Sequence, residues 1–419
     1  MTALSASLRV VPSAAASVAI GVTDARAAAY ALRRVALTDF RSYASLRLAV
    51  DARPVVLTGG NGAGKTNLLE AVSFLAPGRG LRRARLSDVG HRLHLGRGWG
   101  VAIELDTPDG AHEIGTGLEG GQSAESSDED DDEAGETAAT ERRVVRLNGT
   151  PAKSQTILAG LLTMLWLTPE MDRLFMDSAS GRRRFFDRIA FAFVPDHARR
   201  LNAYERALRE RQRLLRDGPA DASWLAALEL ALAENGVAVA AARLMVLAQL
   251  NHAVAETHGA FPQPSIALAG ALEERLAAAP ALAVEDWFKA TLARNRRLDA
   301  ESGRAQVGPH RSDLRVRHVE KDMPAELCST GEQKALLIAL TLATARLIKK
   351  VRGTAPILLL DEIAAHLDER RRRELFDEIT ALGSQAWLTG TDTALFAPLV
   401  GRAQFLTVAH GAVVPNEME

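Results

Sequence analysis

The sequence predicts an α/β fold in which a domain with a mixed sheet is interrupted by a mostly helical insertion. Alternating strand-like patterns dominate residues 31–168 and return after residue 300. Between them, residues 169–299 are rich in arginine, alanine and leucine at helical spacing. A glycine-rich loop follows one apolar strand and opens a helix, an order typical of α/β domains.

Length and composition limit the class of protein. A chain of 419 residues is long for one domain, and its 47% hydrophobic and 25% charged residues are ordinary for a globular protein. The longest uncharged apolar run, residues 335–345, is shorter than the roughly 18 residues that a spanning helix needs. A single cysteine, Cys328, excludes an internal disulfide. We therefore expect a cytoplasmic protein with no membrane partner.

Charge is distributed unevenly along the chain. We expect residues 1–30 to be a disordered extension, because the folded pattern starts near residue 31. Residues 119–141 hold ten acidic residues and no basic ones, which leaves 42 acidic against 51 basic residues elsewhere, a net charge of +9. The body of the protein is thus basic, which is compatible with a polyanionic partner.

The first part of the sheet domain covers residues 31–168. Two short strands flank FRSY, the strand PVVLTG runs into the glycine loop, and the helix TNLLEAVSFLA follows. Further strands are predicted at WGVAIEL, RVVRLNG and TMLWLT, so this part combines strands with one early helix. The acidic insert 119–141 falls between two of these strands and is predicted to be a solvated loop.

Residues 169–299 are predicted to form a helical lobe without strands. One helix places Leu201, Tyr204, Leu208 and Leu215 on a single face. Residues 182–216 contain eleven arginines against four acids, which suits either a solvated face or a phosphate-binding surface. The sheet domain resumes over residues 300–419, with strands at DLRVRH, PILLL, AWLTG and AQFLTV.

The glycine-rich loop has the spacing of a phosphate-binding loop. It reads Gly59-Gly60-Asn61-Gly62-Ala63-Gly64-Lys65-Thr66. Glycines let successive N–H groups and the helix N-terminus face phosphates. Lys65 can then reach the β- and γ-phosphates, and the Thr66 hydroxyl can ligate Mg²⁺.

A second carboxylate-bearing element supplies a partner for that loop. The apolar strand 357–360 ends in Asp361 and Glu362. Asp361 is predicted to lie on the metal side, and Glu362 to polarise the attacking water.

Residues Ser329-Thr330-Gly331-Glu332-Gln333 stand directly before an apolar helix. A serine hydroxyl and a glycine amide at a helix N-terminus form an anion site suited to a γ-phosphate. Ser329 could instead be only a helix cap with Glu332 at the third position, and the two interpretations are compatible.

This order of elements is the ATP-binding-cassette arrangement, and the chain resembles the RecF family, relatives of the SMC heads. The resemblance extends over residues 31 to about 410. It is carried by LTDFRSY, GGNGAGKTNLLEAV, LTPEMDRLFMDSASGRRRFFDR, LARNRRL with GPHRSDL, STGEQKALLIALTLA, LLLDEIAAHLD and WLTGTD.

The resemblance implies a nucleotide site shared between two subunits. ATP and Mg²⁺ would be held by residues 59–67, through Gly59, Gly60, Asn61, Gly62, Ala63, Gly64, Lys65, Thr66 and Asn67, together with Asp361. Glu362 would activate water, with Lys65 as its catalytic partner on the phosphates. In an ATP-dependent homodimer, Ser329, Gly331 and Gln333 would contact the partner's nucleotide, and Asp368 would lie at the seam.

The implied function is ATP-dependent DNA binding in recombinational repair and fork maintenance. The partners would be duplex and gapped DNA near single-strand/double-strand junctions, with RecR, RecO and RecA. Phosphate contacts are expected at Arg199, Arg206 and Arg209. Slow hydrolysis would serve as a switch. The alternatives are an ATP-binding DNA clamp with negligible hydrolysis and, less favoured by the signature, a transporter ATPase subunit.

Some residues depart from the wider cassette pattern. Glu170 stands near the position where transporter cassettes carry a glutamine, and Thr389 and Thr391 stand where many cassettes have a histidine. His310 and Arg311 are expected to support the fold or face DNA. No grouping of the ten histidines suggests a metal site, and Cys328 is expected to be a packing residue.

Overall fold

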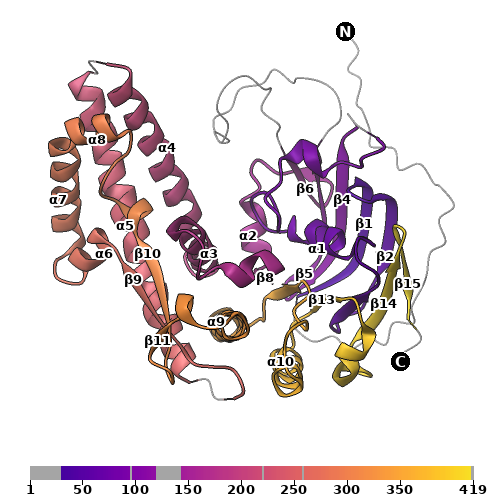
Figure 1. The fold of residues 1–419 in the computed structure, drawn as a ribbon. Helices are drawn as coiled ribbons and strands as arrows, with labels where there is room; N and C mark the ends of the chain where they lie inside the picture. Colours follow the sequence, from indigo (N-terminus) through magenta and orange to yellow (C-terminus); the bar gives the residue numbers. More distant parts are fainter. Residues whose placement is uncertain (1–29, 95–96, 119–142, 219–220, 257–258, 417–419) are drawn as a thin grey trace, which may run out of the picture.

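The computed structural model describes residues 30–94, 97–118, 143–218, 221–256 and 259–416. The predicted N-terminal extension therefore lies, up to residue 29, outside the described residues. Figure 1 shows a sheet-rich head on one side and a lobe of long helices on the other, joined by α9 (Thr330–Arg352).

The central sheet of the head is assembled from distant parts of the chain. Its order is β15-β14-β3-β13-β12-β8, and all of its pairs are parallel except β14 with β15. Its strands are β3 (Val55–Thr58), β8 (Met164–Leu167), β12 (Ile357–Leu360), β13 (Ala386–Gly390), β14 (Gln404–Ala409) and β15 (Ala412–Pro415). Four of them, β3, β8, β12 and β13, are buried along their whole length, as expected for parallel strands covered on both faces.

A second, antiparallel sheet has the order β2-β1-β4-β5-β6-β7. Its strands are β1 (Ala31–Phe40), β2 (Tyr43–Ala49), β4 (Trp99–Thr107), β5 (Gly110–Leu118), β6 (Val144–Leu147) and β7 (Thr150–Pro151). Helix α1 (Lys65–Ser73) shares one apolar core with strands of both sheets. The strands of residues 31–168 are thus divided between two sheets, and α2 (Ile157–Leu161) adds a second, short helix.

The acidic insert connects neighbouring strands. Strands β5 and β6 pair antiparallel up to Gly117 opposite Val144. The insert itself, residues 119–141, lies outside the described residues.

The second lobe is mainly helical. It contains α3 (Ala179–Phe191), α4 (His197–Arg216), α5 (Ala222–Ala255), α6 (Ala271–Leu276), α7 (Ala281–Arg294) and α8 (Arg296–Ser302). The prediction of a region without strands is wrong at β9 (Pro264–Ala269), which pairs with β10 (Asp313–His318). Strand β11 (Met323–Pro324) completes this small sheet. The apolar alternation in PSIALA is short, and the strand that pairs with it lies about fifty residues further on, so the local pattern alone did not predict a strand there.

Helix α5 is long and apolar enough, by length and composition, to cross a membrane. Half of its most apolar window is buried in the protein, and it packs against α4, α7 and α9. Glu229 and Arg243 within it are buried and form ion pairs with other helices. These contacts are those of a core helix.

Short 3-10 turns and one further helix complete the described chain. The turns are η1 (Leu86–Val89), η2 (Pro169–Arg173), η3 (Pro309–Arg311), η4 (Ala325–Leu327) and η5 (Thr393–Leu399). Helix α10 (Glu369–Leu382) follows the carboxylate-bearing strand β12 and packs on α9.

Candidate nucleotide-binding site

The glycine-rich loop lies between β3 and α1, and two of its glycines, Gly59 and Gly64, are required sterically. Gly59 has φ 147°, and a Cβ there would lie 2.2 Å from the carbonyl oxygen of Val408. Gly64 has φ 115°, and a Cβ there would lie 2.8 Å from the Tyr43 hydroxyl. A side chain at either position would force the loop away from the head, so both glycines maintain the loop's curvature.

Lys65 places its charge inside this loop. Its Nζ donates to the carbonyl oxygens of Gly59, at 2.8 Å, and Gly60, at 2.9 Å, and only 5% of the residue is exposed. The ammonium is therefore held over the curved backbone. A polyphosphate bound to the loop would meet this cation together with the N-terminus of α1.

Thr66, Asp361 and Thr389 come together at the ends of α1, β12 and β13. The Thr66 hydroxyl lies 3.0 Å from both carboxylate oxygens of Asp361. The Thr389 hydroxyl donates to Asp361 at 2.7 Å and accepts the N–H of Glu362 at 2.8 Å. A hydroxyl and a carboxylate are hard oxygen ligands of the type that Mg²⁺ prefers, so this donor set fits the ion.

Thr389 is fully buried in β13, beside the strand β12 that ends at the two carboxylates. It orients Asp361 and the backbone of Glu362 from inside the protein. Thr389, one of the two threonines that stand where many cassettes have a histidine, thus has a positioning role in this structure. The sequence pattern could not show the strand register that brings Thr389 to Asp361, in which Leu360 of β12 lies beside Leu388 of β13.

Glu362 has a backbone φ of 49°, in the left-handed region, and is half-buried. Among the residues that the structure describes, none hydrogen-bonds to its carboxylate. Lys334 of α9 is 5% exposed, and its Nζ lies 3.5 Å from the Glu362 carbonyl oxygen and 3.4 Å from Asp172. The carboxylate thus keeps its hydrogen-bonding capacity, as a group that polarises water requires.

The FRSY turn between β1 and β2 braces the loop. The Tyr43 hydroxyl donates to the Gly64 carbonyl at 3.0 Å, and burial raises the pKa of this phenol. Asn67 donates to the Ser42 hydroxyl at 2.9 Å. Arg41 forms a two-pronged ion pair with the buried Glu70 of α1. Sequence reasoning noted this stretch without giving it a role, because the contact joins segments about twenty residues apart.

The second predicted anion site begins α9. Ser329 is its N-cap, and Ser329 and Glu332 form a reciprocal capping box. Lys321 forms an ion pair with Glu332, and Lys321 and the Ser329 N–H hold the pKa of Glu332 down to about 2. In the described part of the chain, the Ser329 side chain bonds only to Glu332. The structure therefore does not bring Ser329 to the glycine loop of its own chain.

The other residues predicted for this half of the site differ in exposure. Gly331 is half-buried, and nothing lies within 4 Å of the place a Cβ would take. Gln333 is 2% exposed and donates to the Cys328 carbonyl at 2.8 Å, so it is turned into the chain. Asp368 is exposed and caps α10 by accepting the Arg371 N–H.

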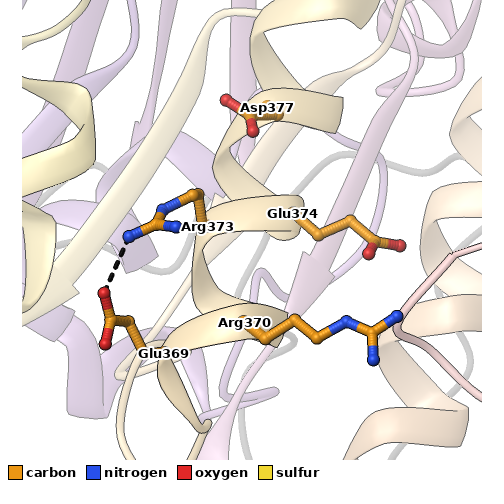
Figure 2. Close-up of a pocket in the computed structure, with 5 residues that line it drawn as sticks. All are labelled: Glu369, Arg370, Arg373, Glu374 and Asp377. Carbon is orange, nitrogen blue, oxygen red and sulfur yellow. Dashed lines mark hydrogen bonds and ion pairs between the residues drawn. The ribbon is translucent and has the colours of Figure 1, made fainter.

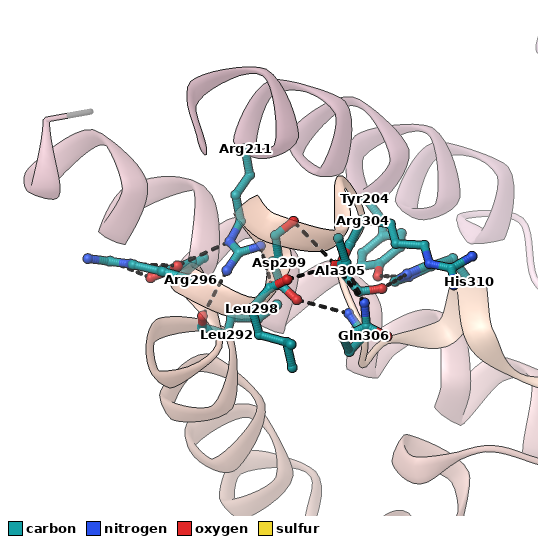
Figure 3. Close-up of polar contacts among 12 residues, drawn as sticks. Tyr204, Arg211, Leu292, Arg296, Leu298, Asp299, Arg304, Ala305, Gln306 and His310 are labelled. Carbon is teal, nitrogen blue, oxygen red and sulfur yellow. Dashed lines mark hydrogen bonds and ion pairs between the residues drawn. The ribbon is translucent and has the colours of Figure 1, made fainter. Parts of the chain in front are cut away.

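Helix α4 carries the arginines predicted to contact DNA. Arg199 is exposed and pairs with Asp196 at 2.9 Å. Arg206 and Arg209 are also exposed. Arg211 on the same helix is fully buried and belongs to a network with Glu229 and other residues (Figure 3). The eleven arginines of residues 182–216 are therefore not one uniform surface.

The remaining predictions concern single residues. His310 is part of the fold: its ring bonds to the Tyr204 hydroxyl at 2.6 Å and to the Ala305 carbonyl at 3.0 Å. Cys328 is buried, which confirms a packing role, and burial raises the pKa of its thiol. Glu170 is exposed in η2.

A hollow on the surface lies away from these residues. It runs along the outer face of α10, where Glu369 bonds to Arg373 at 2.7 Å (Figure 2). It is lined by Glu369, Arg370, Arg373, Glu374 and Asp377. Its lining has three acidic residues and two arginines, a net negative charge, so it adds no anion-binding chemistry to the site.

Known proteins with the same arrangement confirm the fold. The family model described as the RecF/RecN/SMC N terminal domain matches residues 31–397. A solved structure of the recombination mediator protein RecF with ATP, of the RecFOR pathway, covers 94% of this chain and 100% of its own, with TM-score 0.77 and 21% identity. An Smc head domain from Pyrococcus furiosus covers 92% of this chain and 96% of its own, with TM-score 0.51 and 17% identity. The predicted cassette-type head with an inserted helical lobe is thereby confirmed.

Curated relatives are much more similar in sequence. The DNA replication and repair protein RecF of Rhizobium rhizogenes is 52% identical over 387 residues, which cover 92% of this chain and 98% of the relative. The protein of the same name from Agrobacterium fabrum is 50% identical over 384 residues, which cover 91% and 98%. This chain belongs to the RecF family of DNA replication and repair proteins, within the RecF/RecN/SMC class.

Proposed function

We propose that this protein is an ATP-gated DNA-binding protein of replication and recombinational repair. The observation that carries the proposal is the direct bonding of Thr66 and Thr389 to Asp361, beside Lys65 in the glycine loop. These groups form a complete phosphate and metal half-site within one chain. Family membership supports the same conclusion.

Each residue of the half-site has a defined task. Lys65 binds the β- and γ-phosphates, and the loop amides bind the remaining oxygens. Thr66 and Asp361 would hold Mg²⁺, which when bound neutralises phosphate charge. Thr389 keeps the Asp361 carboxylate and the Glu362 backbone in place. The Glu362 carboxylate accepts a proton of the water that attacks the γ-phosphate.

The second half of the site is proposed to come from another copy of the chain. Ser329 and Gly331 lie at the N-terminus of α9, which packs in the core on one face of the central sheet, whereas α1, which follows the glycine loop, packs in the core on the other face. A homodimer would bring Ser329 and Gly331 of each copy to the γ-phosphate of the other, with Asp368 at the seam. Nucleotide binding would then control whether the dimer closes, and this is the sense in which the protein is ATP-gated.

DNA contact can be assigned to either of two arginine-rich surfaces. The predicted one is α4, where the ion pairs of Arg199, Arg213 and Arg216 with nearby acids reduce the net charge. The other is the post-α1 segment, residues 79–97, which holds one acid, Asp88, and six exposed arginines: Arg79, Arg82, Arg83, Arg85, Arg92 and Arg97. RecR, RecO and RecA are proposed as partners, because the resemblance to the RecF family implies them.

Salt dependence of DNA binding tests the function and distinguishes the surfaces. For duplex DNA, the log of affinity falls with the log of salt by about 0.9 per phosphate contact. The pair Arg206→Glu with Arg209→Glu should weaken ATP-dependent duplex binding and flatten that slope if α4 contacts the backbone. The matched pair Arg83→Glu with Arg85→Glu should do so if the post-α1 segment contacts it. Each variant must still dimerise with ATP, and fluorescence anisotropy provides the affinities.

The result has three clear outcomes. If only the α4 variant loses duplex binding, the result supports the residues predicted from sequence. If only the post-α1 variant loses duplex binding, the DNA contacts lie on the head. Wild-type protein that shows no ATP-dependent duplex binding at any salt concentration would contradict the proposed function itself.

A clamp without hydrolysis is the main alternative, and Glu362→Gln separates it from a slow ATPase. The substitution keeps the side chain's shape and removes its charge. In an ATPase it should lower the hydrolysis rate by about 100-fold or more while ATP still binds and the dimer persists. A wild-type rate no higher than that of the variant would favour the clamp. The transporter alternative is not supported by the family to which the chain belongs.

A further inference from the structure

Asp39, His91 and His94 form a cluster that the sequence pattern did not reveal. Each offers one ligand atom, and the three atoms lie within 4.8 Å of one another. The tertiary structure thus groups two of the ten histidines with a carboxylate, which was not expected from the sequence. Asp39 ends the stretch LTD of β1, whereas both histidines lie in HRLH after η1, about fifty residues later. We propose that this cluster is a binding site for a zinc-type divalent ion.

The backbone holds the two segments together independently of the side chains. The N–H of His91 donates to the Asp39 carbonyl at 2.8 Å, and the N–H of Arg41 donates to the Val89 carbonyl at 2.9 Å. Phe40 and Gly90 form an antiparallel bridge between these two bonds. The ligand-bearing residues are thus prepositioned on paired backbone, which lowers the entropy lost on binding an ion.

The local conformation aims the side chains at one point. Asp39 has φ 48°, in the left-handed region, which Asp adopts more readily than most residues. His94 Nδ1 contacts the Asp39 carboxylate. The two imidazole rings are 4.8 Å apart between centroids and tilted by 38°. All three side chains are half-buried, so water and ions can reach them.

The ligand types select the ion. Two imidazole nitrogens and one carboxylate oxygen suit Zn²⁺, Co²⁺ or Ni²⁺ better than Mg²⁺, which prefers oxygen alone. Ligand atoms around tetrahedral zinc lie about 3.3 Å apart, from bonds of about 2.0 Å. His94 Nδ1 and the Asp39 carboxylate, which are in contact, must move apart to reach this spacing, and the longer separations in the cluster must close. His91 can turn, because its Nδ1 is held only by the Leu93 N–H at 3.3 Å, a long hydrogen bond.

The site would have three protein ligands and one position for water. Arg92 and Arg97 flank the cluster and oppose a further positive charge, so we expect weaker binding than in a four-ligand structural site. A bound ion would tie the post-α1 segment to the end of β1. The neighbouring Arg41 contacts Glu70 of α1, so the ion would also stiffen the support of the glycine loop.

Zinc titration of the full chain tests the site directly. Zn²⁺ is titrated into the protein and followed by isothermal titration calorimetry, in a buffer with excess Mg²⁺ to occupy the Asp361 site. The titration should give one bound Zn²⁺ per chain. His91→Ala and His94→Ala should each lower the affinity at least tenfold. His112→Ala, which removes a half-buried histidine of β5 outside the cluster, is the matched control and should bind as wild type does.

A second measurement protects the test against misfolding. Asp39→Asn keeps a residue that tolerates positive φ and removes the carboxylate, so it should fold yet bind zinc more weakly. The visible spectrum of bound Co²⁺ should show a four- or five-coordinate site in wild type and lose that signature in His94→Ala. Wild-type affinity in both histidine variants, or no zinc binding by wild type, would overturn the proposal. Neither result depends on ATP or DNA binding.

Discussion

The nucleotide half-site and the polar network of the helical lobe both contain basic and acidic side chains, but these side chains differ in how many of their hydrogen bonds are made within the protein. In the lobe, the fully buried Arg211 donates from each of its three nitrogen atoms, to Glu229, Asp299 and the Leu292 carbonyl (Figure 3). In the half-site, Lys65 bonds only to carbonyls of its own loop, and Glu362 has a carboxylate with no hydrogen bond from the described residues.

This difference separates residues that hold the fold from residues that act on a ligand. The lobe network is balanced, because Arg211 and Arg296 face Glu229 and Asp299. The half-site carries groups whose natural partners are phosphate, metal and water. A charged residue with every bond satisfied is an architectural candidate, and one with capacity left over is a functional candidate.

The largest expected effect comes from breaking the balanced network. Arg211→Ala leaves Glu229 and Asp299 buried without their shared cation, which should lower the free energy of unfolding by about 3–5 kcal/mol. Urea unfolding followed by circular dichroism measures this. Arg213→Ala, on the same helix with an exposed pair to Glu210, should leave the free energy of unfolding nearly unchanged. Equal effects of the two substitutions would remove the basis of the comparison.

Acid should weaken the same lobe through His310. Burial lowers the pKa of His310 from 6.5 to about 4. Its Nε2–H faces the Ala305 carbonyl, so its Nδ1 accepts the Tyr204 hydroxyl and the ring is neutral. The unfolded chain takes up the proton first as pH falls, so this contribution is complete above pH 6.5 and is lost towards pH 4. The loss amounts to about 3 kcal/mol.

The measurement for His310 is the pH dependence of urea unfolding. Wild type should lose stability more steeply between pH 6.5 and 4 than His310→Gln, which has no titrating ring. If the free energy of unfolding changed with pH in the same way in the two proteins, His310 would have the same pKa in the folded and the unfolded chain.

A substitution in the nucleotide half-site should lower the affinity for ATP and leave the free energy of unfolding nearly unchanged. Lys65→Ala removes the cation placed on the terminal phosphates and should weaken ATP binding on the order of 100-fold, equivalent to about 2.7 kcal/mol. Unfolding without nucleotide should be nearly unchanged, because the Lys65 ammonium bonds only within the loop. Equilibrium binding of a fluorescent ATP analogue measures the first quantity. Unchanged affinity would contradict the phosphate-loop assignment.

The smallest effect on the single chain is expected at Ser329. Ser329→Arg puts bulk and charge at the open end of α9, where a second copy would approach. ATP binding by the monomer should survive while ATP-dependent dimerisation is lost in sedimentation. Ser329→Ala is the control, because it also removes the helix cap, worth about 1 kcal/mol, without adding bulk. If both variants lost ATP binding as well, the whole site would have to lie within one chain.

The sequence by itself determined the elements whose physics is local. The glycine loop, the buried strands before Lys65 and Asp361 and the cap at Ser329 follow from spacing and residue type, since the chain can form these features without distant contacts. The structure adds that a Cβ at Gly59 or Gly64 would clash with the head.

Only the tertiary structure decided which side chains meet across the chain. Thr389 reaches Asp361 because β13 lies beside β12, and Arg211 is buried because α8 covers the face of α4 that carries it. Asp39 meets His91 and His94 because β1 pairs with a segment fifty residues away. Such contacts depend on strand register and helix packing, which arise from the whole core, and no local pattern encodes them.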